Sequence, residues 1–238
     1  MSRAATGGAS GAGRAVAGEG GEARGERILV VATRSVHKLA ELRQLLHLPA
    51  TRLVSLDEVG VADEAPEDGG TFEENAVFKA RFYAERTGLP TLADDSGLEV
   101  DALGGRPGVR TRRYAGERAT DEENNVKLLE ALRGLPPERR GARYRCVLAL
   151  AEPGRAGAGR RGGASAPAVV IRRGAFEGRI ASEPRGSGGF GYDPIFEPAW
   201  EPPGGRTVGQ YTAAEKNRVS HRAAAARAMR RVLRARGY

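Results

Sequence analysis

Residues 92–97 read Leu-Ala-Asp-Asp-Ser-Gly, a short apolar run that meets two adjacent carboxylates, a hydroxyl and a glycine. The apolar part is typical of the end of a buried strand. Neighbouring carboxylates repel each other and are best tolerated beside a cation, and Mg²⁺ typically takes one or two carboxylates together with substrate phosphates. The stretch therefore indicates either a metal-assisted site at the mouth of a sheet or an Asx turn that caps the next element, and its own residues do not decide between them.

Apolar runs and helical periodicities alternate on both sides of this stretch. Strands are expected at 27–32, 53–55, 91–93, 142–150, 168–173 and 174–180. Helices are expected at 38–48, 71–88, 123–132 and over most of 212–236. Thr71 and Glu74 have the spacing of a capping box, Gly88 is placed to end that helix, and Ser220 is a candidate N-cap. Strands that alternate with helices predict an α/β fold, and the adjacent late strands predict a mixed sheet.

The composition is that of a globular protein with 238 residues, 40% of them hydrophobic, which is enough for one or two domains. We expect a single domain at 27–238, a disordered low-complexity tail at 1–26 and a flexible surface insertion at 153–167. No apolar run reaches the roughly 18 residues of a membrane span, and the N-terminus lacks the apolar centre of a secretion signal. A cytoplasmic protein without membrane contact is therefore expected. The single cysteine, Cys146, lies in an apolar run that is typical of core packing.

The net charge of +8 favours polyanionic partners. Arginine, alanine and glycine are abundant, which is also the mark of GC-rich coding, and 5% aromatic residues are few for stacking on nucleic-acid bases. A basic nucleic-acid-binding protein is one alternative, and it predicts duplex binding that falls steeply with salt.

Two polar segments flank the predicted helices of the first half. Residues 33–38 connect a strand to a helix start, which suits either an anion or an ordinary capped connection. Residues 66–76 are acidic before a helix, which suits the helix dipole as well as a metal ion. Asn75 and Lys79 share one helical face, directed at a phosphate or at solvent.

Two further segments lie in the second half. Residues 186–194 carry four glycines within six positions, so the backbone there is able to approach a ligand closely or to form a packed turn. Phe190 and Tyr192 offer faces for a base, and Asp193 offers acceptors for a base edge. His221 and Arg222 follow Ser220 in the first turn of a helix, where cations are unfavourable unless an anion also binds.

Taken in order, five motifs of the chain resemble the inosine triphosphate pyrophosphatase family. They are Thr-Phe-Glu-Glu-Asn-Ala at 71–76, Ala-Asp-Asp-Ser-Gly-Leu at 93–98, Leu-Gly-Gly-Arg-Pro-Gly-Val at 103–109, Gly-Gly-Phe-Gly-Tyr-Asp-Pro at 188–194 and Ser-His-Arg at 220–222. The resemblance runs from about residue 27 to 236. It implies a long mixed sheet flanked by helices, two lobes with the active-site cleft between them, and a homodimer. It also implies Mg²⁺-dependent hydrolysis of dITP, ITP and XTP to the monophosphate and pyrophosphate, which keeps these nucleotides out of DNA and RNA, without nucleic acid or membrane as partner.

The resemblance also implies roles for single residues. Asp95 corresponds to the catalytic proton acceptor and a metal ligand. Substrate contacts correspond to Thr33, Arg34, Ser35, Val36, His37, Lys38, Ser96, Phe190, Gly191, Tyr192, Asp193, Lys216, His221 and Arg222.

Two positions depart from the family pattern. Ser35 stands where an Asn is usual, and since a hydroxyl still donates to phosphate, altered affinity rather than lost activity is expected. Pro66 stands where relatives often have a metal-binding Glu, which leaves Glu67 as the nearest substitute. A pyrophosphatase for modified pyrimidine nucleotides, of similar architecture, is the other enzymatic alternative, and a panel of substrates separates the two.

Overall fold

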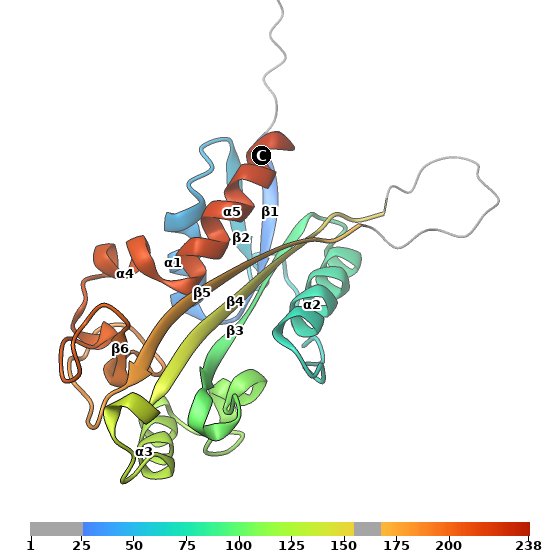
Figure 1. Ribbon diagram of the computed structural model, residues 1–238. Helices are drawn as coiled ribbons and strands as arrows, with labels where there is room; N and C mark the ends of the chain where they lie inside the picture. Colours follow the sequence, from blue (N-terminus) through green and yellow to red (C-terminus); the bar gives the residue numbers. More distant parts are fainter. Residues whose placement is uncertain (1–25, 155–167) are drawn as a thin grey trace, which may run out of the picture.

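The computed structural model describes residues 26–154 and 168–238 and contains a six-stranded sheet in the order β2-β1-β3-β4-β5-β6 (Figure 1). The strands are β1 (Arg27–Ala32), β2 (Thr51–Ser55), β3 (Thr91–Val100), β4 (Gly141–Ala151), β5 (Val170–Ile180) and β6 (Phe196–Pro198). β1 runs parallel to β2 and β3, whereas β3, β4, β5 and β6 pair antiparallel. The predicted mixed α/β sheet is confirmed. The expected tail at 1–26 and insertion at 153–167 fall outside the described residues except at their edges.

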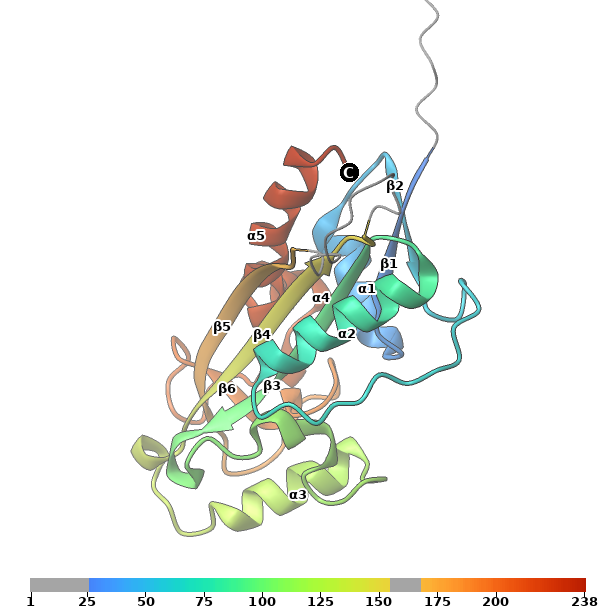
Figure 2. The same cartoon turned by 90° about the vertical axis from the view of Figure 1, so that its right-hand side faces the viewer.

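Helices cover both faces of this sheet. They are α1 (Val36–Leu46), α2 (Phe72–Thr87), α3 (Asp121–Ala131), α4 (Ala213–Val219) and α5 (His221–Ala235), with a 3₁₀ segment η2 (Gly108–Arg113) after β3. α2 lies on one side of the long strands and α1 and α5 on the other, while α3 sits at their far end (Figures 1 and 2). None of these described helices has the length and apolarity needed to cross a membrane.

The alternation of side chains along the strands builds two cores. Leu92 and Leu148 belong to the buried cluster under α1 and α5. Their neighbours Ala93 and Val147 belong to the cluster under α2. Because successive residues of a strand point to opposite faces, each position along β3 is committed to one of the two helical layers.

The predicted caps are present. Thr71 and Glu74 form a reciprocal capping box at the start of α2, and Gly88 ends that helix at a φ of 65°. Ser220 caps α5 by accepting from the backbone N–H of Ala223. The first helix occupies 36–46 rather than 38–48, because Ser35 is its N-cap and accepts from the N–H of Lys38.

The acidic stretch is not a turn, contrary to one of the two interpretations, and it does not end its strand. β1 ends at Ala32, opposite Ala93. From Asp94 onward β3 loses this parallel neighbour but stays paired with β4, with Asp95 opposite Val147. The antiparallel partner keeps the strand extended, so the two carboxylates lie in mid-strand, just beyond the carboxyl end of β1.

The two late strands expected at 168–173 and 174–180 are one strand, β5. Gly174 marks the expected break, but it serves a different purpose. A Cβ at this position would lie 2.1 Å from the carbonyl oxygen of His221, so only glycine lets the strand pass under the start of α5.

Candidate active site

Asp94 and Asp95 point to opposite faces of the sheet. Asp94 is 1% exposed and faces α1 and α5, where its Oδ1 lies 2.7 Å from Lys38 Nζ and its Oδ2 accepts from Arg222 Nε at 2.9 Å. Ser96 Oγ donates to Asp94 Oδ1 at 2.9 Å, and the thiol of buried Cys146 donates to Oδ2 at 3.3 Å. Burial alone would raise the pKa of Asp94, but Arg222 and Lys38 outweigh it and hold that pKa well below its usual value.

Asp95 faces α2. Lys79 Nζ donates to Asp95 Oδ1 at 2.8 Å, and Asn75 Nδ2 approaches Oδ2 at 3.4 Å. The same ammonium donates to Glu67 Oε1 at 3.0 Å and to the carbonyl oxygen of Asp94 at 3.0 Å. Burial raises the pKa of Asp95, and the charge of Lys79 only partly opposes this. A carboxylate with a raised pKa is a stronger base, and Lys79 holds it in place.

Lys79 therefore keeps two carboxylates together at one point. Burial would also raise the pKa of Glu67, but Lys79 and Lys38 hold it below its usual value, so Glu67 stays ionised. No three His, Cys, Asp or Glu side chains form a metal cage within the ranges that the structure describes. Two converging carboxylates nevertheless fit Mg²⁺, which completes its shell with substrate phosphates and water.

In the loop at 33–38, which was expected to suit an anion, some residues make structural contacts and others reach the candidate site. Thr33 Oγ1 accepts from the N–H of Ser35 at 3.1 Å, and Lys38 reaches Asp94. The guanidinium of Arg34 is turned away, to Asp57 and to the carbonyl oxygens of residues 61–63. Val36 is the first residue of α1 and is 71% exposed.

A second charged cluster joins α1 to α4 and α5. Lys216 Nζ lies 2.6 Å from Asp193 Oδ2 and 2.9 Å from Glu41 Oε1. Arg222 pairs with the other oxygen of Glu41 and donates to Ser96 Oγ at 2.8 Å. Burial would raise the pKa of Glu41, but Arg222 and Lys216 hold it lowered. Glu41 was not predicted; its one signal is its place one helical turn after Lys38.

The glycine-rich segment presents one aromatic face rather than two. The ring of Phe190 is half-buried, stacks on His37 at 5.2 Å between centroids, and has Lys216 Nζ 4.1 Å from its centre. Tyr192 is 3% exposed, packs in the core, and donates to the carbonyl oxygen of Thr111 at 2.8 Å. The expectation of an accessible aromatic face is therefore wrong for Tyr192 and stays a prediction for Phe190.

Asp193 is not a free acceptor. Its Oδ2 accepts from Lys216 and from the N–H of Phe190 at 2.9 Å, and its Oδ1 accepts from the hydroxyl of Tyr144 at 3.2 Å. Burial raises the pKa of Asp193 against the charge of Lys216. A Cβ on Gly189 would lie 2.1 Å from Asp193 Oδ2, which explains one glycine of the segment. Asp193 thus fixes the loop that carries Phe190.

Gly191 is held by α3. Its N–H donates to Asp121 Oδ2 at 2.6 Å, and its carbonyl oxygen accepts from Asn125 Nδ2 at 3.1 Å. Neither α3 residue was predicted, since both look like ordinary polar positions of a surface helix. They fix the backbone next to Phe190 from the far end of the sheet.

His221 is buried and stacks on Tyr144 with 4.6 Å between ring centroids and 7° between planes. Burial, together with the nearby charges of Arg222 and Lys216, holds the pKa of His221 well below its usual value, so the ring is neutral. The first turn of α5 therefore carries one cation rather than the expected two. The carboxylates of Asp94 and Glu41 offset the charge of Arg222.

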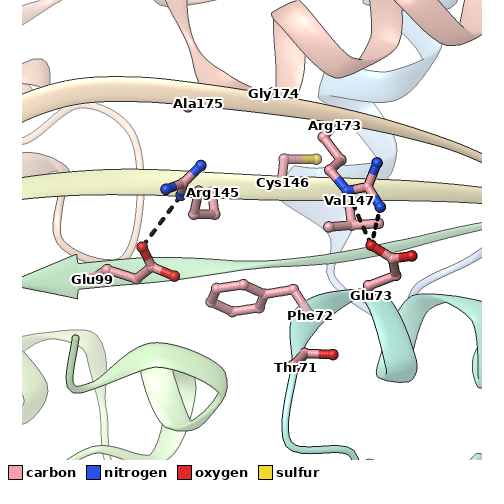
Figure 3. Close-up of a pocket in the computed structure, with 10 residues that line it drawn as sticks. All are labelled: Thr71, Phe72, Glu73, Glu99, Arg145, Cys146, Val147, Arg173, Gly174 and Ala175. Carbon is pink, nitrogen blue, oxygen red and sulfur yellow. Dashed lines mark hydrogen bonds and ion pairs between the residues drawn. The ribbon is translucent and has the colours of Figure 1, made fainter. Parts of the chain in front are cut away.

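A pocket of the described chain lies away from these residues. It measures about 390 Å³ and opens between the start of α2 and strands β4 and β5 (Figure 3). Its lining includes two ion pairs, Arg145 with Glu99 and Arg173 with Glu73. None of the predicted site residues lines it. The converging charged groups around Asp94 and Asp95 therefore locate the candidate site better than the size of a cavity does.

Comparisons with known proteins agree on one family. The family model described as the Ham1 family matches residues 29–232. A dITP/XTP pyrophosphatase from Mycolicibacterium paratuberculosis is 47% identical over 216 residues, which cover 88% of this chain and 98% of that protein. A second dITP/XTP pyrophosphatase, from Geobacter sulfurreducens, is 49% identical over 195 residues, 82% of this chain and 90% of that protein. The solved structure of a HAM1 protein from Coxiella burnetii superposes with a TM-score of 0.75 at 43% identity and covers 87% of this chain and 98% of its own.

Proposed function

The chain belongs to the Ham1 family, and we propose that it is a nucleoside triphosphate pyrophosphatase that acts on dITP, ITP and XTP. The products are the nucleoside monophosphate and pyrophosphate. The observation that carries the proposal is the placement of Asp95, a buried carboxylate held beside Glu67 by Lys79 and next to the Lys38–Asp94 pair. Relatives that are 47% and 49% identical are named dITP/XTP pyrophosphatases, which favours purine substrates over modified pyrimidines and over nucleic acid.

Asp95 is the proposed proton acceptor. Its raised pKa suits a base that takes the proton of a water molecule attacking the α-phosphorus, while the bond to the β-phosphate breaks. Lys79 fixes the carboxylate, and Lys38 and Arg222 are proposed to contact the substrate while they remain paired with Asp94. Asp95 and Glu67 are the proposed Mg²⁺ ligands, and the ion, when bound, would polarise the phosphate oxygens.

The base is proposed to bind at Phe190. Its half-buried ring stacks on His37 and has Lys216 Nζ 4.1 Å from its centre, and we propose that a base joins this stack. A keto oxygen at purine position 6 accepts hydrogen bonds, whereas the amino group of adenine donates them. Donors in the site would therefore lack partners with ATP, and such mismatches discriminate strongly. Gly191, Tyr192, Asp193 and neutral His221 are proposed to shape this end of the site.

The same family membership supports three further proposals, which concern the cofactor, the assembly and the location. We propose Mg²⁺ as the metal, a homodimer as the assembly and the cytoplasm as the location, with neither nucleic acid nor membrane as partner. Sedimentation velocity tests the assembly, since a dimer has twice the chain mass of 25.2 kDa. A monomer at micromolar concentration would contradict it.

A substrate panel tests the function. Release of pyrophosphate is measured with dITP, XTP, GTP, ATP and modified pyrimidine triphosphates in Mg²⁺ buffer. We expect kcat/KM for dITP and XTP to exceed that for ATP by about a hundredfold or more. Preferred turnover of a pyrimidine, or salt-dependent duplex binding without turnover, would contradict the proposal.

Asp95→Asn is the catalytic control of the same assay. It keeps the shape of the side chain and its contact with Lys79 but removes the base, so kcat should fall by about 10²–10⁴-fold while the melting temperature stays near that of the wild type. Wild-type turnover in this variant would show that Asp95 is not the proton acceptor.

A further inference from the structure

The cations of the site are already neutralised before any substrate arrives. Four cationic side chains meet five carboxyl groups there: Lys38, Lys79, Lys216 and Arg222 against Glu41, Glu67, Asp94, Asp95 and Asp193. Each of the four lies within 3.0 Å of a carboxylate oxygen. The cluster therefore has no surplus positive charge, although a triphosphate brings several negative charges. One divalent cation does not offset all of them, so a further cation is needed.

Among the described residues, Arg113 is the side chain that we assign as this further cation. It is the last residue of η2, on the connection between β3 and α3, and reaches the segment before α2. Its Nη2 lies 3.5 Å from the carbonyl oxygen of Glu67, and its Nε lies 3.7 Å from Glu117 Oε1. Both distances are at or beyond the limit of a hydrogen bond. The guanidinium is one-third exposed and lies next to the segment that carries Glu67, and its ion pair with Glu117 is its one, loose, side-chain partner among the described residues.

We propose that Arg113 binds the phosphate chain next to Glu67 and takes up the charge of the leaving pyrophosphate. This inference rests on the proposed function and adds a residue to that site. When the bond between the α- and β-phosphates breaks, the bridging oxygen leaves with the electron pair, and negative charge accumulates on the pyrophosphate. A guanidinium pairs two N–H groups with phosphate oxygens and stabilises that charge.

The position of Arg113 assigns it to the phosphates rather than to the base. Its guanidinium lies 3.5 Å from the backbone of Glu67, whereas the partners of Asp193 at the base end are Lys216, Tyr144 and the N–H of Phe190. Its neighbour Arg112 is exposed, and no hydrogen bond or ion pair links its side chain to the described residues. Arg112 thus provides a matched control: the same residue type on the same segment, without access to Glu67.

Calorimetric titration of inorganic pyrophosphate in Mg²⁺ buffer tests the assignment without requiring turnover. Arg113→Gln should weaken pyrophosphate binding about 10- to 100-fold, the effect of losing a hydrogen bond to a charged group. Arg112→Gln should bind like the wild type, and Arg113→Lys should recover part of the affinity because it restores the charge. Inhibition of dITP hydrolysis by dIMP should change little in Arg113→Gln, whereas kcat should fall.

Equal pyrophosphate binding in Arg113→Gln and Arg112→Gln would overturn the proposal, as would a loss of dIMP inhibition with pyrophosphate binding intact. Thermal melting shows whether Arg113→Gln has a folding defect. If it does, Arg113→Lys decides alone, because it is expected to recover only part of the affinity. Wild-type pyrophosphate affinity with an unchanged kcat in Arg113→Lys would then count against the assignment. A wild-type protein that binds pyrophosphate but does not hydrolyse dITP would refute the proposed function separately.

Discussion

Relatives often have a metal-binding Glu at the position of Pro66, and the next residue of this chain, Glu67, is the proposed substitute. Its carboxylate is held 3.0 Å from Lys79 and points to the same ammonium as Asp95. If Glu67 is the second ligand, Glu67→Gln should raise the Mg²⁺ concentration for half-maximal activity about tenfold or more. At saturating Mg²⁺ most of kcat should return. The measurement is dITP turnover as a function of Mg²⁺.

Glu64→Gln is the matched control for this experiment. Its side chain is 84% exposed and is 3.8 Å from Arg34, its partner in a loose ion pair. We expect its Mg²⁺ dependence to equal that of the wild type. If the two variants behave alike, Glu67 is not a ligand, and Asp95 holds the metal without it.

His221 makes stability depend on pH. Burial and neighbouring cations hold its pKa in the folded state below the unfolded value of about 6.5. Below that pH the unfolded chain binds a proton that the folded chain rejects, so this contribution is complete above pH 6.5 and is lost as the pH falls. The slope reaches about 1.4 kcal/mol per pH unit.

Urea unfolding at pH 7.5 and 5.5 measures this effect. His221→Phe keeps a ring against Tyr144 but removes the titration, so the variant should lose less stability than the wild type between the two pH values. His47→Asn, at an exposed helix end, should follow the wild type. Equal losses in wild type and His221→Phe would mean that the buried ring is not neutral in the folded state.

Single residues were predictable where their chemistry is local. The pair Asp94–Asp95 and the cationic Lys38 stand out in the sequence because of charge and spacing. Glu41, Asp121 and Asn125 do not, because each acts on a partner more than 60 positions away along the chain. Tyr192 was predicted to offer a stacking face but is buried, because an aromatic residue in a glycine-rich segment is equally typical of a stacking face and of a packed core.

Among the elements, β3 carries the site and depends on close packing at Gly97. A Cβ there would lie 2.7 Å from the carbonyl oxygen of Gly108 and 2.8 Å from the ring of Phe72. Gly97→Ala should therefore cost about 1–3 kcal/mol of unfolding free energy, as overpacking usually does. Gly154→Ala, whose added Cβ would have no atom of the described residues within 4 Å, should be neutral. Chemical denaturation measures both, and equal stability of the two variants would show that η2 moves aside freely.

The ends of α2 were predicted to within one residue, whereas the carboxyl end of β3 was not. A capping box such as Thr71 with Glu74 spans four residues, so the sequence contains both partners. The extent of β3 depends on β4, about fifty positions later in the chain. That pairing keeps Asp94 and Asp95 extended and turns them to opposite faces, which a local reading of Asp-Asp-Ser-Gly as turn residues does not anticipate.

On the scale of the whole molecule, the sheet joins the two charged clusters. The parallel half, β2-β1-β3, ends near the Asp94–Asp95 pair, and the antiparallel half carries the loop of Phe190 at its far end. The mixed sheet was predictable from the order of strands and helices. The junction between the halves was not, because it arises where β1 stops and β3 continues, and both lengths are set by pairing across the sheet.

We expect the first 25 residues, which precede the described part of the chain, to be dispensable for folding and for activity. Arg27 opens β1, and its guanidinium donates to the carbonyl oxygen of Arg236 at 2.9 Å and lies over the ring of Tyr238, which ties the strand to the end of the last helix. The match to the Ham1 family also starts only at residue 29. A chain that starts at Glu26 should keep its melting temperature and its dITP turnover within about twofold. A chain that starts at Thr33 lacks β1, which pairs with both β2 and β3, and should show no cooperative melting. Loss of activity in the shorter deletion, with melting unchanged, would assign residues 1–25 a part in catalysis.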